Sequence, residues 1–155
     1  MTDIDTWRKN GTHSSSSAIS TVSGWSRQTS GDGIGYDGSG MSESSGVWTF
    51  PSTGIWKIDF YFNFYHSSDS KYVGAFLQYS PDGGSSFGTA TEAYGSISYV
   101  STNTWDLVTG SHFFDVTSTS LDKVRFQVES ANTLSLAAGT NNSLTYVQFM
   151  RVGDT

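Results

Sequence analysis

The segment GVWTFPSTGIWKIDFYFNFY, residues 46–65, decides the fold of this chain. Within it, apolar side chains recur at every second position from 56 to 64, which is the period of a β-strand with one face in a core. Pro51 fixes a backbone φ angle and Gly54 permits unusual backbone angles, so we expect a sharp turn between a short strand at 46–50 and a long one. The core-facing residues predicted for the long strand are Trp56, Ile58, Phe60, Phe62 and Phe64.

The composition indicates a single all-β domain. The 155 residues include 17 glycines and 15% aromatic residues but only 14% charged ones, and no long stretch keeps a helical period of apolar residues. This usage is typical of strands joined by many turns. A chain of this length buries roughly two-thirds of its unfolded surface in one core, which leaves no room for a second folded domain.

Turn sequences divide the chain after residue 46 into short strands. Strands of roughly five to ten residues between such turns are typical of a two-sheet sandwich or jelly roll, which we expect to occupy residues 46–155. The segment 123–129 alternates between polar and apolar residues, so one of its faces is expected to meet water. The predicted strands are Tyr72–Tyr79, Thr89–Tyr94, Ser96–Val100, Leu107–Val116, Lys123–Glu129 and Leu144–Val152.

Residues 1–45 are rich in serine and glycine and poor in apolar residues, so we predict an extended N-terminal arm with short edge strands. Weak strand patterns occur at 18–25 and at 34–36. The segment is either a flexible tail or an ordered arm that wraps a neighbour. Because it offers little apolar surface to offset its ordering entropy, we expect it to become ordered only against a partner.

The last predicted strand is apolar on both of its faces. In a sandwich of this size only one face of a strand meets the core. The other face is therefore expected to contact another subunit, unless it carries the scattered apolar residues that ordinary surfaces show. The long strand that follows the Pro51–Gly54 turn also carries more apolar residues on its outer face than a water-exposed face needs. The predicted subunit interface comprises Ile55, Tyr61, Tyr65, Leu144, Tyr146, Met150 and Val152.

Charge and hydropathy exclude two classes of partner. The net charge is −6, the sequence pI is about 4.7, and the eight Lys and Arg residues are scattered, so no nucleic-acid partner is expected. No segment approaches the ~20 apolar residues that a membrane span needs, and no signal peptide is expected. The chain has no cysteine, which excludes disulfides and thiolate metal sites.

No constellation of residues indicates an enzyme, a metal site or a cofactor. The three histidines, His13, His66 and His112, stand in unrelated sequence contexts, and no serine has the surroundings of a catalytic nucleophile. The acidic, glycine-rich segment Gly31–Gly38 could wrap a calcium ion, although an ordinary turn explains it better. A different route to function is sugar binding by aromatic residues near strand ends, for which the candidates are Tyr79, Tyr94, Tyr99 and Trp105.

The order of these elements resembles the jelly roll of the tumour necrosis factor and complement globular-head superfamily. FPSTGIWKIDFYF, Phe50–Phe62, is similar to the proline, glycine and aromatic signature of that superfamily, and TYVQFMRV, Thr145–Val152, stands where its final strand does. The resemblance covers residues 40–152. It implies a ten-stranded sandwich that assembles as a threefold trimer, with the final strand near the trimer axis.

A second resemblance is to short proteins of marine and freshwater bacteriophages. It is carried by Thr6-Trp7-Arg8, by the run Gly38-Ser39-Gly40-Met41-Ser42, and by the closing Arg151-Val152-Gly153-Asp154-Thr155. This resemblance implies a component of a virion. The chain differs from the collagen-linked members of the superfamily, since it contains no collagen repeat.

These observations lead to the hypothesis of a non-enzymatic, homotrimeric capsid decoration, or cement, protein. It would be assembled in the host cytoplasm, reside on the capsid surface of the virion, and bind the major capsid protein. The alternative hypothesis is a tail-fibre or head-fibre tip that binds a host surface glycan or receptor. The residues expected to contact the capsid or a neighbouring subunit from the N-terminal arm are Trp7, Arg8, Ile19 and Trp25.

Overall fold

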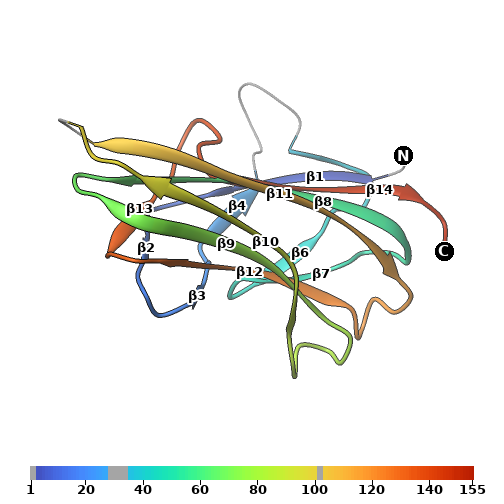
Figure 1. Ribbon diagram of the computed structural model, residues 1–155. Coiled ribbons are helices and arrows are strands. Elements are labelled where there is room, and N and C mark those ends of the chain that lie inside the picture. The colour runs from blue at the N-terminus through green and yellow to red at the C-terminus, as the bar shows by residue number, and fades with distance from the viewer. Residues whose placement is uncertain (1–2, 28–34, 101–102) are drawn as a thin grey trace.

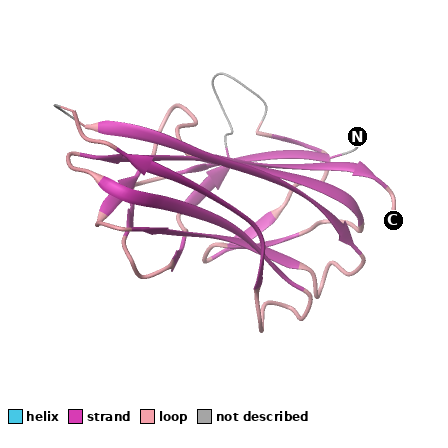
Figure 2. Ribbon diagram, viewed as in Figure 1, coloured by secondary structure: helices cyan, strands magenta, loops and turns pink. Residues whose placement is uncertain are grey.

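The computed structural model describes residues 3–27, 35–100 and 103–155. Over these residues the chain forms fourteen strands and no helix, arranged as two antiparallel sheets stacked face to face (Figures 1 and 2). This confirms the predicted all-β, two-sheet sandwich. The strands are β1 (Asp3–Lys9), β2 (His13–Ser15), β3 (Ser20–Thr21), β4 (Trp25–Arg27), β5 (Tyr36–Asp37), β6 (Ser42–Ser44), β7 (Val47–Thr49), β8 (Gly54–His66), β9 (Ser70–Ser80), β10 (Gly88–Ile97), β11 (Thr104–Val116), β12 (Lys123–Ser130), β13 (Leu134–Leu136) and β14 (Tyr146–Gly153).

The larger sheet, here called sheet A, has eight strands centred on β8. One edge of β8 pairs with β11 along its full length, and the other edge pairs with β14 and then with β13. Strand β1 pairs with the free edge of β14, and β4 and β5 pair with β1. The segments nearest the two ends of the chain therefore lie side by side in one sheet (Figure 1).

The smaller sheet, here called sheet B, has six strands in the order β10-β9-β12-β7-β6, with β3 paired to β12. Two strands predicted at 89–94 and 96–100 are a single strand, β10, which ends at Ile97. The outer residues of β12 are polar and its inner residues Val124, Phe126 and Val128 are fully buried, as the alternation predicted. Strand β13 was not predicted from the sequence.

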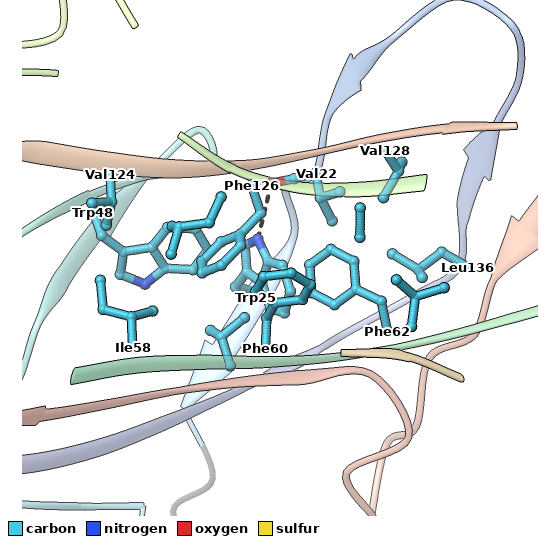
Figure 3. Close-up of a cluster of buried hydrophobic side chains, with 14 of the residues drawn as sticks. Val22, Trp25, Trp48, Ile58, Phe60, Phe62, Val124, Phe126, Val128 and Leu136 are labelled. Carbon is cyan, nitrogen blue, oxygen red and sulfur yellow. Dashed lines mark hydrogen bonds between the residues drawn. The ribbon is translucent and has the colours of Figure 1, made fainter. Parts of the chain in front are cut away.

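The core between the sheets is built mainly from aromatic rings. The five residues predicted to face inward from β8 are all fully buried. Phe126 of sheet B lies 5.9 Å from Phe60 and 5.7 Å from Phe62, measured between ring centroids. Trp48 lies 5.2 Å from both Phe126 and Trp25, and Figure 3 shows these rings interlocked between the two sheets.

The glycine in the predicted turn before β8 is required by its surroundings. Gly54 has a φ of +133°, and a Cβ atom there would lie 2.6 Å from the carbonyl oxygen of Gly153. A side chain at this position would therefore strain the backbone and press on the end of β14. This close approach lets the long strand begin directly beside the C-terminal strand.

The N-terminal residues differ from the expected extended arm. Strand β1 pairs with β14 from Asp3 opposite Arg151 to Arg8 opposite Tyr146, and Val22 and Trp25 lie in the core (Figure 3). The indole nitrogen of Trp25 donates to the carbonyl oxygen of Val22 at 2.9 Å. Because β1 satisfies the backbone groups along the edge of β14, a segment with few apolar residues is ordered within the sandwich itself.

Candidate functional site

The outer face of sheet A, which points away from the core, carries many apolar side chains. On β8 this face presents Ile55, Tyr61 and Tyr65, because the alternate residues point inward. Residues directly opposite each other on paired strands share a face. Tyr146 lies opposite Tyr61 and Met150 lies opposite Lys57, so β14 extends the same surface.

Strand β11 adds the most exposed side chains of this face. Trp105 lies opposite Tyr65, Leu107 opposite Asn63 and Phe113 opposite Lys57. Their exposed fractions are 52%, 53% and 58%. Together with the half-buried apolar side chains of β8 and β14 they gather on one face, and such a cluster marks an interaction surface more often than scattered residues do. We call this surface the sheet A face.

Two stacked ring pairs hold aromatic side chains of the sheet A face in place. Tyr61 and Tyr146 lie 4.5 Å apart with their planes at 12°, and Tyr65 and Trp105 lie 4.8 Å apart at 28°. Burial, followed by the nearby Tyr61 and Asp59, raises the pKa of Tyr146. Side chains that are already ordered lose little entropy when a partner covers them.

The charged groups on the sheet A face are largely compensated. Lys57 Nζ donates to Asp59 Oδ2 at 2.6 Å, and Asp59 is buried. Arg8 lies opposite Tyr146 on β1, and its Nε is buried with no hydrogen-bond partner among the described residues. A buried donor without an acceptor costs about 1–3 kcal/mol.

The structure brings most of the predicted interface residues together. Five of the seven, Ile55, Tyr61, Tyr65, Tyr146 and Met150, share the sheet A face. The other two adjoin the ends of β14. Leu144 precedes the strand and its carbonyl oxygen accepts a hydrogen bond from Asn63 Nδ2, while Val152 is exposed where the pairing with β8 shifts register.

Sequence reasoning missed the contribution of Leu107 and Phe113, although a signal for it was present. Trp105, Leu107 and Phe113 share one parity of β11, and Val108, Phe114 and Val116 share the other. Both parities are therefore apolar, as they are in β8 and β14. The second set is buried in the core, so the first set is left on the outside.

The residues expected to make arm contacts lie in four different environments. Trp25 is in the core, so it is not available to a capsid or a neighbouring subunit while the sandwich is folded. Trp7 is half-buried and its ring meets that of Trp48 edge-on at 6.4 Å. Arg8 lies on the sheet A face, and Ile19 is exposed in the connection between β2 and β3.

The titratable residues show structural contacts. Each histidine hydrogen-bonds a hydroxyl-bearing residue: His13 contacts Ser20, His66 contacts Ser68 and His112 contacts Thr91. Within residues 3–27, 35–100 and 103–155, no group of three or more His, Asp or Glu side chains is placed to hold a metal ion. Part of the calcium candidate, residues 31–34, lies outside the described residues. The described chain contains no helix with the length and hydropathy to span a membrane.

The fold is that of tumour necrosis factor-like proteins. Murine APRIL superposes with a TM-score of 0.69 at 14% identity in a structure determined at pH 8.0, covering 97% of this chain and 98% of that chain. Eiger TNF from S. frugiperda superposes with a TM-score of 0.69 at 10% identity, covering 98% of this chain and 93% of that one. No family model matches the sequence, and no curated protein matches it. The likeness establishes the jelly-roll fold.

Proposed function

We propose that this chain is a non-enzymatic structural protein that forms a homotrimer through the sheet A face, and that the trimer decorates and stabilises a bacteriophage capsid. The observation that carries the proposal is the sheet A face itself. The inner face of this sheet already fills the core, so its apolar outer face needs a separate partner.

The sheet A face contains two unlike parts, which suits a cyclic assembly. Trp105, Leu107 and Phe113 project from β11, which among the described strands pairs only with β8. The β8 and β14 side chains beside them are half-buried. A ring of three identical subunits requires a heterologous contact, in which one patch meets a different patch on the next subunit. Packing of the β11 side chains on the half-buried β8 and β14 side chains of the next subunit would provide such a contact.

The polar groups of the sheet A face are compatible with burial in an interface. The Lys57–Asp59 pair is formed within one subunit, so covering it does not leave an isolated charge. Arg8 lies beside Tyr146 on the sheet A face, so its guanidinium would be at the edge of the interface. Arg8 is thus assigned to contact between subunits, and Ile19 remains the candidate for contact with the shell.

The virion part of the proposal draws on the resemblance of Thr6-Trp7-Arg8, Gly38–Ser42 and Arg151–Thr155 to bacteriophage proteins. A trimer at a threefold or quasi-threefold point of a shell would tie adjacent capsomers together. Each weak contact with the major capsid protein would act three times, which raises the overall affinity without any new kind of contact.

Two measurements test the proposal. Native mass spectrometry of the purified protein is expected to give three times the monomer mass, and a monomer would contradict the assembly. Quantification in purified virions is expected to show hundreds of copies that are lost when the shell is stripped. A handful of copies that co-purify with tails would instead favour the fibre-tip alternative.

A further inference from the structure

An open groove lies on the outer face of sheet B, on the opposite side of the sandwich from the sheet A face. Its volume is about 510 Å³, within the range of roughly 300–1,000 Å³ that is usual for small-molecule sites. Both polar and aromatic side chains line it. The lining residues are Lys71, Tyr72, Tyr94, Gly95, Ser96 and Glu129.

Glycine at position 74 leaves room for the ring of Tyr94 to lie against β9. Gly74 of β9 stands between Tyr94 of β10 and Glu129 of β12, because it is opposite both of them in the two ladders. A Cβ atom on Gly74 would lie 2.8 Å from Cε1 of Tyr94, closer than non-bonded carbon atoms normally approach, so the ring would have to shift. The Tyr94 ring therefore packs in the space that the missing side chain of Gly74 leaves free.

The Tyr94 ring is held in position although its side chain remains 55% exposed. Tyr72 and Phe76 meet it edge-on, with centroid distances of 6.4 Å and 5.7 Å. The Tyr94 hydroxyl donates to Glu129 Oε1 at 3.3 Å. An exposed ring that is fixed by three neighbours offers a preorganised apolar surface to a ligand in the groove.

We infer that this groove binds a neutral sugar, of one or two rings. A sugar ring has an apolar C–H side that packs on an aromatic ring and hydroxyl groups that both donate and accept hydrogen bonds. The groove supplies the ring of Tyr94, an acceptor in Glu129 and donors in Lys71 and Ser96. The charges of Lys71 and Glu129 balance, so neither an anion nor a cation is favoured over an uncharged ligand.

This site does not depend on the assembly proposed above. The groove belongs to sheet B, so it stays open when the sheet A face is covered, and it is equally present in a monomer. A trimer would display three copies of it, which would strengthen binding to a surface that carries many sugars. Oligomeric state and sugar binding can therefore fail or succeed separately.

The inference is tested by amide NMR titration of the full chain with glucose, galactose, mannose and N-acetylglucosamine. At least one of these sugars is expected to shift the amides of Gly95 and Ser96 at millimolar concentrations. Choline and N-acetylneuraminic acid serve as charged probes and are expected to leave both amides unshifted. No shift with any of the four neutral sugars overturns the inference, and so does a shift of these amides by a charged probe.

Variants then separate stacking from incidental contact. Tyr94→Ala is expected to weaken binding at least about tenfold, and Tyr94→Phe, which keeps the ring, is expected to weaken it less. Tyr99→Ala removes an exposed tyrosine outside the groove and is the matched control. Unchanged affinity in Tyr94→Ala overturns the inference. Should that variant not fold, Glu129→Ala takes its place, with the same expected loss and the same overturning result.

Discussion

Asp5 and Arg27 form a two-point ion pair that joins β1 to β4. Arg27 Nε lies 2.8 Å from Asp5 Oδ1, and Arg27 Nη2 lies 2.8 Å from Asp5 Oδ2. The same carboxylate accepts the backbone N–H of Met41 at 2.6 Å and the indole N–H of Trp7 at 2.8 Å. Hydrogen bonding to Asp5 raises the pKa of Arg27. Asp5 is only 1% exposed, and its carboxylate links β1 to β4 and to the segment that contains Met41.

Replacing Asp5 by alanine is expected to lower the free energy of unfolding by about 3–5 kcal/mol, because it removes the carboxylate that accepts from a partly buried guanidinium and from two further N–H donors. Urea denaturation measures the change. Trypsin is expected to cleave after Arg8 and Lys9 more readily in this variant. Asp37→Ala, at an exposed position, is the control and should stay within about 0.5 kcal/mol of the wild type. Equal stability of the two variants would contradict the linking role of Asp5.

A methyl group at Gly110 is expected to destabilise the fold by about 1–3 kcal/mol. A Cβ atom there would clash with Cζ of Phe60 and lie 2.5 Å from its Cε1, and Phe60 is fully buried and unable to move aside. Gly88→Ala is the matched control, since its Cβ would meet no atom within 4 Å. Thermal unfolding of both variants checks this, and an unaffected Gly110→Ala would show that the core has room at Phe60.

Stability at alkaline pH is expected to depend on Tyr79. Burial, followed by the hydrogen bond from its hydroxyl to Asp122 at 2.5 Å, raises the pKa of Tyr79 from 10.0 to about 12. The folded state therefore holds this proton more tightly than the unfolded state. The resulting stabilisation is complete below pH 10 and is lost as the pH rises through about 12. From pH 10 to 12 the free energy of unfolding should fall more steeply in the wild type than in Tyr79→Phe, and parallel curves would refute this.

A carboxylate on the sheet A face is expected to dissociate the proposed trimer. Phe113→Asp and Met150→Asp would each place a charge where the proposed trimer buries apolar surface, and each is expected to raise the trimer dissociation constant at least about tenfold. Leu121→Asp, at an exposed turn away from that face, is the control. Native mass spectrometry gives the oligomeric state and circular dichroism shows that the monomers remain folded. Trimers of undiminished stability in both test variants would place the interface elsewhere.

The sequence by itself determined the class of fold and the two faces of its long strands. In β8 and β14 the alternation of side chains follows from the backbone geometry of a strand, so the parity of Trp56 or Phe149 is enough to place it inward. The same rule places Tyr61, Tyr146 and Met150 outward. The direction of a side chain along a strand depends only on the local backbone, so these predictions hold in the structure.

Tertiary structure alone decided which strands lie together. Asp5 meets Arg27 across 22 residues, β1 pairs with β14 from the other end of the chain, and Gly74 is placed between Tyr94 and Glu129. Register between distant strands depends on contacts that no local pattern contains, because a strand can pair with any edge whose faces match its own. Because β1 pairs with β14, N-terminal residues that the sequence pattern suggested were an extended arm belong to the sandwich. It also brought β11 beside β8 to complete the sheet A face.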